Sequence, residues 1–397
     1  MNEVPAVDLA PLLQLLLVGL ALASVAIGLL WMRHGRQSAG HWRRTLTVLT
    51  LFLTFDLIVF GAFTRLTDSG LGCPDWPGCY GNASPLGAQA EIHAAQTAMP
   101  SGPVTHHKAW IEMVHRYLAT GVGALITVLA IMGWRAARRQ EAAGLSWRGG
   151  DPPLGRALPL FTLGWVCLQG AFGALTVTMK LFPAIVTLHL LGGLVLLVLL
   201  AVQAERLQRE HHGRARVLLG SGSRLWLWFT GGLLWLQVAL GGWVSTNYAV
   251  LVCTDFPTCH GSLWPEMRFA EGFELWRALG LRGDGQLLSL EALTAIHYTH
   301  RLMAYVVLLL LAVVVWRLRG VMELRTPRRW LAGLAALQFL TGLSNVVLGW
   351  PLVAALLHTA GAAALMLALT WALASSRASV AAVRYAVPSA SPADQSA

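Results

Sequence analysis

Nine long apolar stretches constrain this chain more than any other feature of its sequence. Each is long enough to cross a hydrocarbon core, which takes about 20 residues of helix. A backbone in lipid must satisfy its own hydrogen bonds, so these stretches are expected to be helices. They cover residues 8–32, 46–64, 110–133, 157–179, 183–203, 225–246, 292–316, 330–350 and 352–375. Only 12% of the residues are charged and 56% are apolar, which excludes a soluble domain. The sequence therefore predicts an all-α polytopic membrane protein.

The placement of Lys and Arg predicts the orientation of these helices. Cytoplasmic loops of membrane proteins carry an excess of basic residues. Of the 29 basic residues, 21 lie in four short loops and the segment after residue 375, whereas the two long loops, 65–109 and 247–291, hold five. We therefore expect the long loops and the N-terminus outside and the C-terminus in the cytoplasm. The net charge of +10 follows from this bias, and it gives no reason to expect nucleic-acid binding. The N-terminus lacks the basic region of a signal peptide, so a bacterial inner membrane is the expected location.

The chain contains an internal repeat. GCPDWPGCYG at 72–81 matches VCTDFPTCHG at 252–261, and EMVHRYLA at 112–119 matches HYTHRLMA at 297–304. Residues 169–189 match 338–358 without a gap, which pairs His189 with His358. Because each copy contains an even number of helices, the copies have the same orientation, as in parallel repeats related by an axis along the membrane normal.

The repeat divides the chain into five predicted parts. Two parallel four-helix bundles follow one extra N-terminal helix, and a basic linker joins the bundles. The parts are 1–45 (extra helix and basic loop), 46–204 (first repeat), 205–224 (cytoplasmic linker), 225–375 (second repeat) and 376–397 (cytoplasmic tail).

Four of the five cysteines lie in the long loops as two C-x5-C pairs. Paired thiols outside a plasma membrane are expected to be disulfides. Zinc or free thiols are the alternatives, although the spacing is wider than the C-x2–4-C of structural zinc sites. We therefore predict a disulfide within each loop, with a structural or a redox role. The fifth, Cys167, is predicted to be a small core residue.

Four histidines recur at matched depth in the two halves. His115 and His189 each lie about six residues from the outer end of their helices, or about 9 Å deep. His300 and His358 repeat this arrangement in the second half. Ionisable side chains at this depth usually face the bundle interior, and paired imidazoles are common axial ligands of haem iron. A satisfied core residue is the alternative for any single histidine, but the repetition favours haem. Gly192 and Gly361, three residues after a histidine, are expected to leave room for the ring.

The two halves differ one helical turn before the first histidine of each pair. Glu112 precedes His115, whereas His297 precedes His300. Residues three apart share a helix face, so Glu112 is expected to look into the pocket of His115. This difference predicts a reacting porphyrin in the first half and an electron-transfer haem in the second, unless Glu112 is only a hydrated interfacial residue.

Two arginines follow these histidines directly, Arg116 and Arg301. A guanidinium near the outer interface is suited to pairing with haem propionates, and snorkelling to the surface is the alternative. Asp56 stands in the middle of the second helix, where it is expected to be protonated or paired, as part of a proton path or as a structural hydrogen-bonding group.

With these motifs in place, the sequence resembles the haem A synthase family. The resemblance rests on FGAFTRLTDSGLGCPDWPGCYG (60–81), IEMVHRY (111–117), TLHLLGG (187–193), HYTHRLMA (297–304) and LLHTAG (356–361). It covers about residues 46–375. The resemblance implies oxidation of the C8 methyl of haem O to the formyl group of haem A, in two hydroxylations, for haem-copper oxidases.

The resemblance also implies roles for individual residues. Haem O would lie between His115 and His189 beside a catalytic Glu112, and a haem b cofactor would be held by iron ligands His300 and His358. The external disulfides of the family fall on Cys73–Cys79 and Cys253–Cys259. Expected partners are the haem O synthase (a farnesyltransferase), cytochrome oxidase assembly factors, membrane lipid and a second copy of the chain. The helix at 8–32 has no counterpart in the common core.

Two other classes of protein remain compatible with parts of this pattern. A di-haem b membrane cytochrome that only relays electrons would need the same four histidines but no carboxylate at position 112. A transporter built from parallel repeats would explain the duplication and Asp56, but not four histidines at matched depth.

Overall fold

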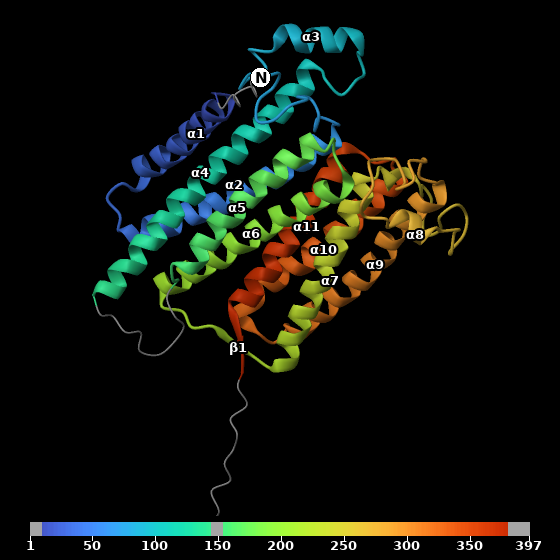
Figure 1. The fold of residues 1–397 in the computed structure, drawn as a ribbon. Helices are drawn as coiled ribbons and strands as arrows, with labels where there is room; N and C mark the ends of the chain where they lie inside the picture. The colour runs from blue at the N-terminus through green and yellow to red at the C-terminus, as the bar shows by residue number, and fades with distance from the viewer. Residues whose placement is uncertain (1–9, 144–153, 380–397) are drawn as a thin grey trace, which may run out of the picture.

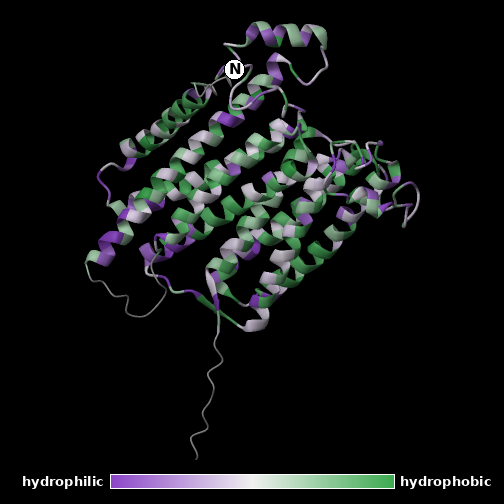
Figure 2. Cartoon of the chain, viewed as in Figure 1, coloured by the Kyte–Doolittle hydropathy of each residue, from purple (hydrophilic) through white to green (hydrophobic). Residues whose placement is uncertain are grey.

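The computed structural model describes residues 10–143 and 154–379 of the chain. Within these ranges nine helices are long and apolar enough to span a membrane, which confirms the predicted all-α polytopic fold (Figure 1). They are α1 (Ala10–His34), α2 (Ala39–Leu66), α4 (His106–Ala142), α5 (Ala157–Thr178), α6 (Pro183–His212), α7 (Ser221–Thr246), α9 (Leu290–Arg317), α10 (Arg325–Val347) and α11 (Leu352–Ala374). Coloured by hydropathy, these helices are mostly apolar along their length, and hydrophilic residues gather towards their ends and in the loops (Figure 2).

Several short elements connect the long helices. The first long loop contains α3 (Gln89–Ala98), and the second contains the 3-10 turn η1 (Ala249–Leu251) and α8 (Phe269–Gly272). A second 3-10 turn, η2 (Met322–Leu324), leads into α10. Strands β1 (Val217–Leu219) and β2 (Ser376–Ala378) pair in parallel, which ties the linker between the repeats to the segment after α11.

Some helices extend beyond the apolar segments that predict them. The helix predicted at 110–133 is α4, which begins at His106 and ends at Ala142. Its first turn is stabilised by the hydroxyl of Thr105, which accepts a hydrogen bond from the backbone N–H of Lys108 at 3.3 Å. Ser38 caps α2 in the same way. Hydropathy marks the part of a helix that lies in lipid, whereas capping side chains decide where its first turn begins.

Contacts between the helices group eight of them into two rings. In the first ring α4 and α5 touch each other, α4 touches α2, α5 touches α6, and α2 touches α6. In the second ring α7, α9, α10 and α11 make the corresponding contacts. The rings meet where α2 and α6 pack against α7 and α11. Leu194 and Leu197 of α6, Val238 of α7 and Ala363 of α11 form a buried apolar cluster there.

Helix α1 packs on the outside of the first ring, against α4. The contact is close, because a Cβ added at Gly19 would lie 2.6 Å from Cβ of Thr120. The side chain of Pro11 lies near Gly78 in the first cysteine loop, so α1 begins on the same side of the molecule as that loop. The predicted external N-terminus and the tail after residue 379 fall on residues outside the described ranges, and the sidedness of both ends stays a prediction.

Candidate functional site

Each long loop is closed by a disulfide bond, as predicted. Cys73 is bonded to Cys79 and Cys253 to Cys259, with Cα–Cα separations of 4.9 and 5.0 Å. His260 lies close enough to the second pair to form a group with metal-binding atoms. Because the two sulfurs are bonded to each other, they offer no thiolates to a metal, and the zinc alternative is wrong for both loops.

An aspartate organises each disulfide loop in the same way. Oδ1 of Asp75 accepts a hydrogen bond from the backbone N–H of Tyr80, and Oδ2 accepts one from Gly81. Asp255 accepts the equivalent bonds from His260 and Gly261. The hydroxyl of Thr258 and these backbone donors lower the pKa of Asp255 to about 2. The sequence repeat is therefore also a structural repeat, down to individual hydrogen bonds.

The two arginines after the histidines hold these loops onto the helices. Nη1 of Arg116 donates to the carbonyl oxygens of Asp75 and Pro77, both at 3.1 Å, and to that of Gly78 at 2.5 Å. In the second half, Nη1 of Arg301 donates to the carbonyl oxygen of Asp255 at 3.0 Å. Nη1 also donates to Thr258 and Nη2 to Cys253, again to carbonyl oxygens. Sequence reasoning missed this use of the guanidinium groups.

Glu112 is tied to the same network. Its Oε1 pairs with Nη2 of Arg116 at 2.6 Å, and its Oε2 accepts the backbone N–H of Cys73 at 2.8 Å. Only 4% of Glu112 and 8% of Arg116 are exposed, so this is a buried ion pair. Its two hydrogen bonds hold the carboxylate between the helix of His115 and the first disulfide. The hydrated interfacial alternative is therefore wrong.

His297 takes the place of Glu112 in the second half. Its Nε2 lies 3.3 Å from Nη2 of Arg301, and its Nδ1 lies 2.9 Å from the carbonyl oxygen of Ala249. The second half thus keeps the contact between the arginine and the residue four positions earlier, but without a negative charge. The difference between the halves predicted from the sequence is a difference in charge at one buried position.

Each of the four predicted iron ligands packs against a glycine of a neighbouring helix. A Cβ added at Gly61 of α2 would lie 3.0 Å from Nε2 of His115, and one at Gly241 of α7 would lie 2.9 Å from Cε1 of His300. The other two rings, His189 and His358, face Gly173 of α5 and Gly342 of α10 at 3.5 and 3.2 Å. The alignment of the repeat already pairs Gly173 with Gly342, but only the structure relates these glycines to the rings.

The second-half pair has the separation that one shared iron requires. The ring centroids of His300 and His358 are 6.5 Å apart. A metal–imidazole bond of about 2 Å on each side, with the ring centre about 1 Å behind the nitrogen, gives a separation of roughly 6 Å. In the first half, the ring of Phe60 stacks against His115, with 6.2 Å between the ring centroids. The residues of the second half therefore fit a haem iron between them, and the first half presents the same two residue types at the repeated positions.

Two smaller expectations, on the glycines after the histidines and on Cys167, differ from the structure. Gly192 and Gly361 make room for the side chains of Gln169 and Gln338, which lie against them, and not for the histidine rings. Cys167 is exposed on α5, so its assignment to the core is wrong.

Asp56 lines an open groove between α2 and α11, where the two rings meet. The other lining residues come from two helices, since Val59, Phe60 and Phe63 belong to α2 and Leu356 belongs to α11. The carboxylate is exposed there. In the described part of the chain, no other residue forms a hydrogen bond or an ion pair with it.

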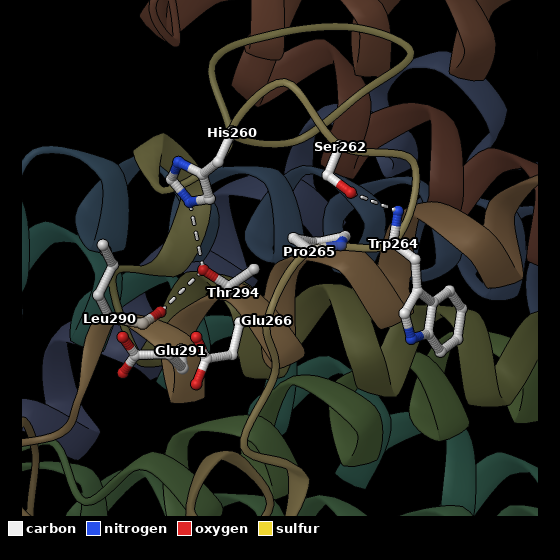
Figure 3. A pocket seen from close by; sticks show the side chains of 8 residues that line it. All are labelled: His260, Ser262, Trp264, Pro265, Glu266, Leu290, Glu291 and Thr294. Carbon is white, nitrogen blue, oxygen red and sulfur yellow. Dashed lines mark hydrogen bonds between the residues drawn. The ribbon is translucent and has the colours of Figure 1, made fainter.

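A small pocket of about 220 Å³ lies beside the second disulfide loop. Figure 3 shows His260 reaching Thr294 of α9, at 3.4 Å between Nε2 and Oγ1, with Glu266 and Glu291 nearby. The pocket is lined by loop residues and by the first turns of α9. None of the four predicted iron ligands lines it.

The fold and the site together define a polytopic membrane protein built from two repeated four-helix rings, each with a pair of histidines suited to haem iron. The chain belongs to the COX15-CtaA family, whose model is described as cytochrome oxidase assembly protein and matches residues 44–370. The nine helices of the described residues that are long enough to span a membrane, together with the bacterial relatives, make it a multi-pass protein of the bacterial inner membrane.

Curated relatives cover most of the chain. A protein of Shewanella oneidensis named heme A synthase is 37% identical over 326 residues, which are 81% of this chain and 92% of the relative. Proteins with the same name from Alkalihalophilus pseudofirmus and Caulobacter vibrioides are 27% and 28% identical over about four fifths of this chain and 90% and 91% of their own lengths.

Proposed function

We propose that this protein is a haem A synthase, an oxidoreductase that converts the C8 methyl group of haem O into the formyl group of haem A. The observation that carries this proposal is the buried carboxylate of Glu112 on the helix of His115. The equivalent residue on the helix of His300 is His297, which has no carboxylate. A chain that only relays electrons would have no use for this difference. Membership of the family and the names of the relatives support the same reaction.

We assign the substrate to the first half. His115 and His189 would ligate the iron of haem O and so hold the macrocycle in one orientation. Rigid placement of the reacting group beside a catalytic group is a large part of an enzyme's rate enhancement. It would also select one methyl group of the ring for oxidation.

Glu112 is the proposed catalytic residue. In each of two successive hydroxylations the methyl carbon would gain the oxygen of one water molecule and release two protons and two electrons, and the electrons would pass to an acceptor outside the chain. The products would be first a hydroxymethyl group and then a gem-diol, which loses water to leave the formyl group. Arg116 and the N–H of Cys73 hold both carboxylate oxygens in place. From this position the carboxylate would accept a proton or stabilise positive charge that develops next to the ring.

The second half is the proposed cofactor site. Haem b, held by His300 and His358, would supply one-electron transfer to or from the substrate site when bound. Arg116 and Arg301 remain proposed partners of the haem propionates. Their hydrogen bonds to loop carbonyl oxygens support a second role, in which each arginine fastens a disulfide loop to the helix that carries His115 or His300.

The proposed partners follow from the reaction. Haem O must come from a farnesyltransferase that attaches the isoprenoid tail, and haem A must pass to the assembly factors of a haem-copper oxidase. A homo-oligomer would bring several such sites together in the membrane.

The test is chromatographic identification of the haems extracted from purified protein made in cells that also produce haem O. We expect haem B together with haem O, its hydroxylated intermediate or haem A. Two haem B groups per chain and no other haem would instead identify a di-haem electron-transfer cytochrome, and colourless protein would favour a transporter.

A further inference from the structure

The two halves also differ in the side chains that touch the far nitrogens of the histidine rings. In the second half, Nδ1 of His358 lies 2.9 Å from Oγ1 of Thr341. The hydroxyl hydrogen of Thr341 is directed to the carbonyl oxygen of Leu337, at 2.8 Å. Its oxygen is therefore free to accept, so the N–H of the imidazole is the donor and the proton stays on Nδ1. This leaves Nε2 of His358 as the nitrogen that can ligate iron.

Gln237 makes the corresponding contact with the other ring. Its terminal amide lies 3.1 Å from Nδ1 of His300. The oxygen of this amide, Oε1, is buried and has no hydrogen-bond partner among the described residues. The amide nitrogen, Nε2, also donates a hydrogen bond to the backbone carbonyl oxygen of His300 at 3.2 Å, so this side chain contacts both the ring and the backbone of His300. Both second-half rings are therefore held at Nδ1 by a polar side chain of a neighbouring helix.

The first half has no side chain of this kind at either position. The repeat aligns Thr341 with Phe172 and Gln237 with Leu57, and neither of these side chains can form a hydrogen bond. Within the described residues, Nδ1 of His189 is buried with no hydrogen-bond partner. A backbone group of residue 57 or 237 contacts the other ring in both halves, so the difference lies in the side chains.

We propose that Gln237 and Thr341 are positioning residues that retain the haem of the second half, whereas Leu57 and Phe172 keep the first-half ligands weak enough for a haem to enter and leave. The inference rests on the proposed function, in which one haem stays bound and the other is exchanged at every turnover. Partners on the far nitrogen orient a metal-bound imidazole and raise its basicity, and their loss typically weakens metal binding 10- to 100-fold.

The first test measures haem loss to apomyoglobin, a haem acceptor, from the purified full-length protein reloaded with haem b in both halves. We expect a fast phase from the first half and a slow phase from the second. The variants His189→Ala and His358→Ala assign the phases, because each removes one ligand. Thr341→Val and Gln237→Leu, which preserve side-chain size, should accelerate the slow phase about 10-fold and leave the fast phase unchanged.

A second readout separates this role from a purely structural one. An Nδ1–H that donates a hydrogen bond makes the imidazole a stronger donor to ferric iron. Thr341→Val should therefore raise the midpoint potential of the second-half haem. Unchanged dissociation and an unchanged potential in both Thr341→Val and Gln237→Leu would overturn the proposal.

The reciprocal variant places the hydroxyl in the first half. Phe172→Thr should slow the fast phase about 10-fold, whereas the control Phe172→Val, which makes nearly the same cavity without a hydroxyl, should not. Equal dissociation from these two variants would also overturn the proposal. Haem b is the probe in both halves of the reloaded protein. The measured dissociation rates therefore do not depend on conversion of haem O.

Discussion

The hydroxyl of Tyr248 donates a 2.7 Å hydrogen bond to the carboxylate of Asp68. These two residues occupy equivalent positions in the two repeats, 180 residues apart. Arg65 and Ser245, a second pair with the same separation, are joined by a 2.6 Å hydrogen bond from the guanidinium to the carbonyl oxygen. Residues contact their own counterparts only near a two-fold axis. The axis that relates the two halves therefore passes between the C-terminal ends of α2 and α7.

Replacement of Tyr248 by Phe should loosen this junction slightly. The variant loses one hydrogen bond to a partly exposed carboxylate but keeps the ring on which Arg65 stacks at 4.0 Å. We expect the free energy of unfolding to fall by about 1 kcal/mol, measured by thermal unfolding in detergent. In a double-mutant cycle with Asp68→Asn, additive effects of the two changes would contradict the contact.

Replacement of Glu112 tests the proposed catalytic carboxylate. Glu112→Gln should leave haem bound and reduce product formation at least about 100-fold, since general acid–base groups contribute that much or more. The measurement is the ratio of haem A to haem O in extracts. Normal turnover in this variant would exclude the role.

The chain itself offers a matched control for that variant. Removal of one partner from a buried ion pair typically costs about 3–5 kcal/mol, so Glu112→Gln puts the fold at risk through Arg116. Glu112→His reproduces the His297–Arg301 contact of the second half and should fold normally while remaining inactive. Activity in a stable Glu112→His variant would show that the carboxylate is dispensable.

The glycines that face the histidine rings should tolerate a methyl group to different degrees. Gly241→Ala places a Cβ 2.9 Å from the ring of His300, whereas Gly173→Ala places one 3.5 Å from the ring of His189, an ordinary contact. Overpacking typically costs about 1–3 kcal/mol, so Gly241→Ala should bind haem b about 10-fold more weakly in a spectroscopic titration. Gly173→Ala should bind like the wild type. Equal affinities of the two variants would rule out this steric role.

Asp56 gives a prediction about stability. An aspartate at the centre of a membrane helix costs about 2.5 kcal/mol or more, and no other described residue forms a hydrogen bond or an ion pair with it. Asp56→Leu should therefore raise the free energy of unfolding by up to about 2 kcal/mol with haem content and turnover unchanged. A loss of turnover at full haem content would assign Asp56 to a proton path instead.

Much of the architecture could be read directly from the chain. Membrane helices are set by local hydropathy, because a backbone in lipid has only its own hydrogen-bonding groups to satisfy it. The sequence alone likewise shows the repeat, the two C-x5-C loops and the four histidines. Predictions of helix ends were less accurate. The start of α4 was missed because Thr105 caps a first turn that lies outside the apolar segment.

What the sequence by itself determined was therefore which residues lie in lipid, which recur and which chemistry they can carry. The tertiary structure decided what each polar side chain touches. It directs Arg116 to loop carbonyl oxygens and Glu112 to Arg116, and it places Gly241 against His300 and Thr341 against His358. The physical reason is that these contacts join different helices and loops. They depend on how the helices are packed and rotated, which no local pattern of residues specifies.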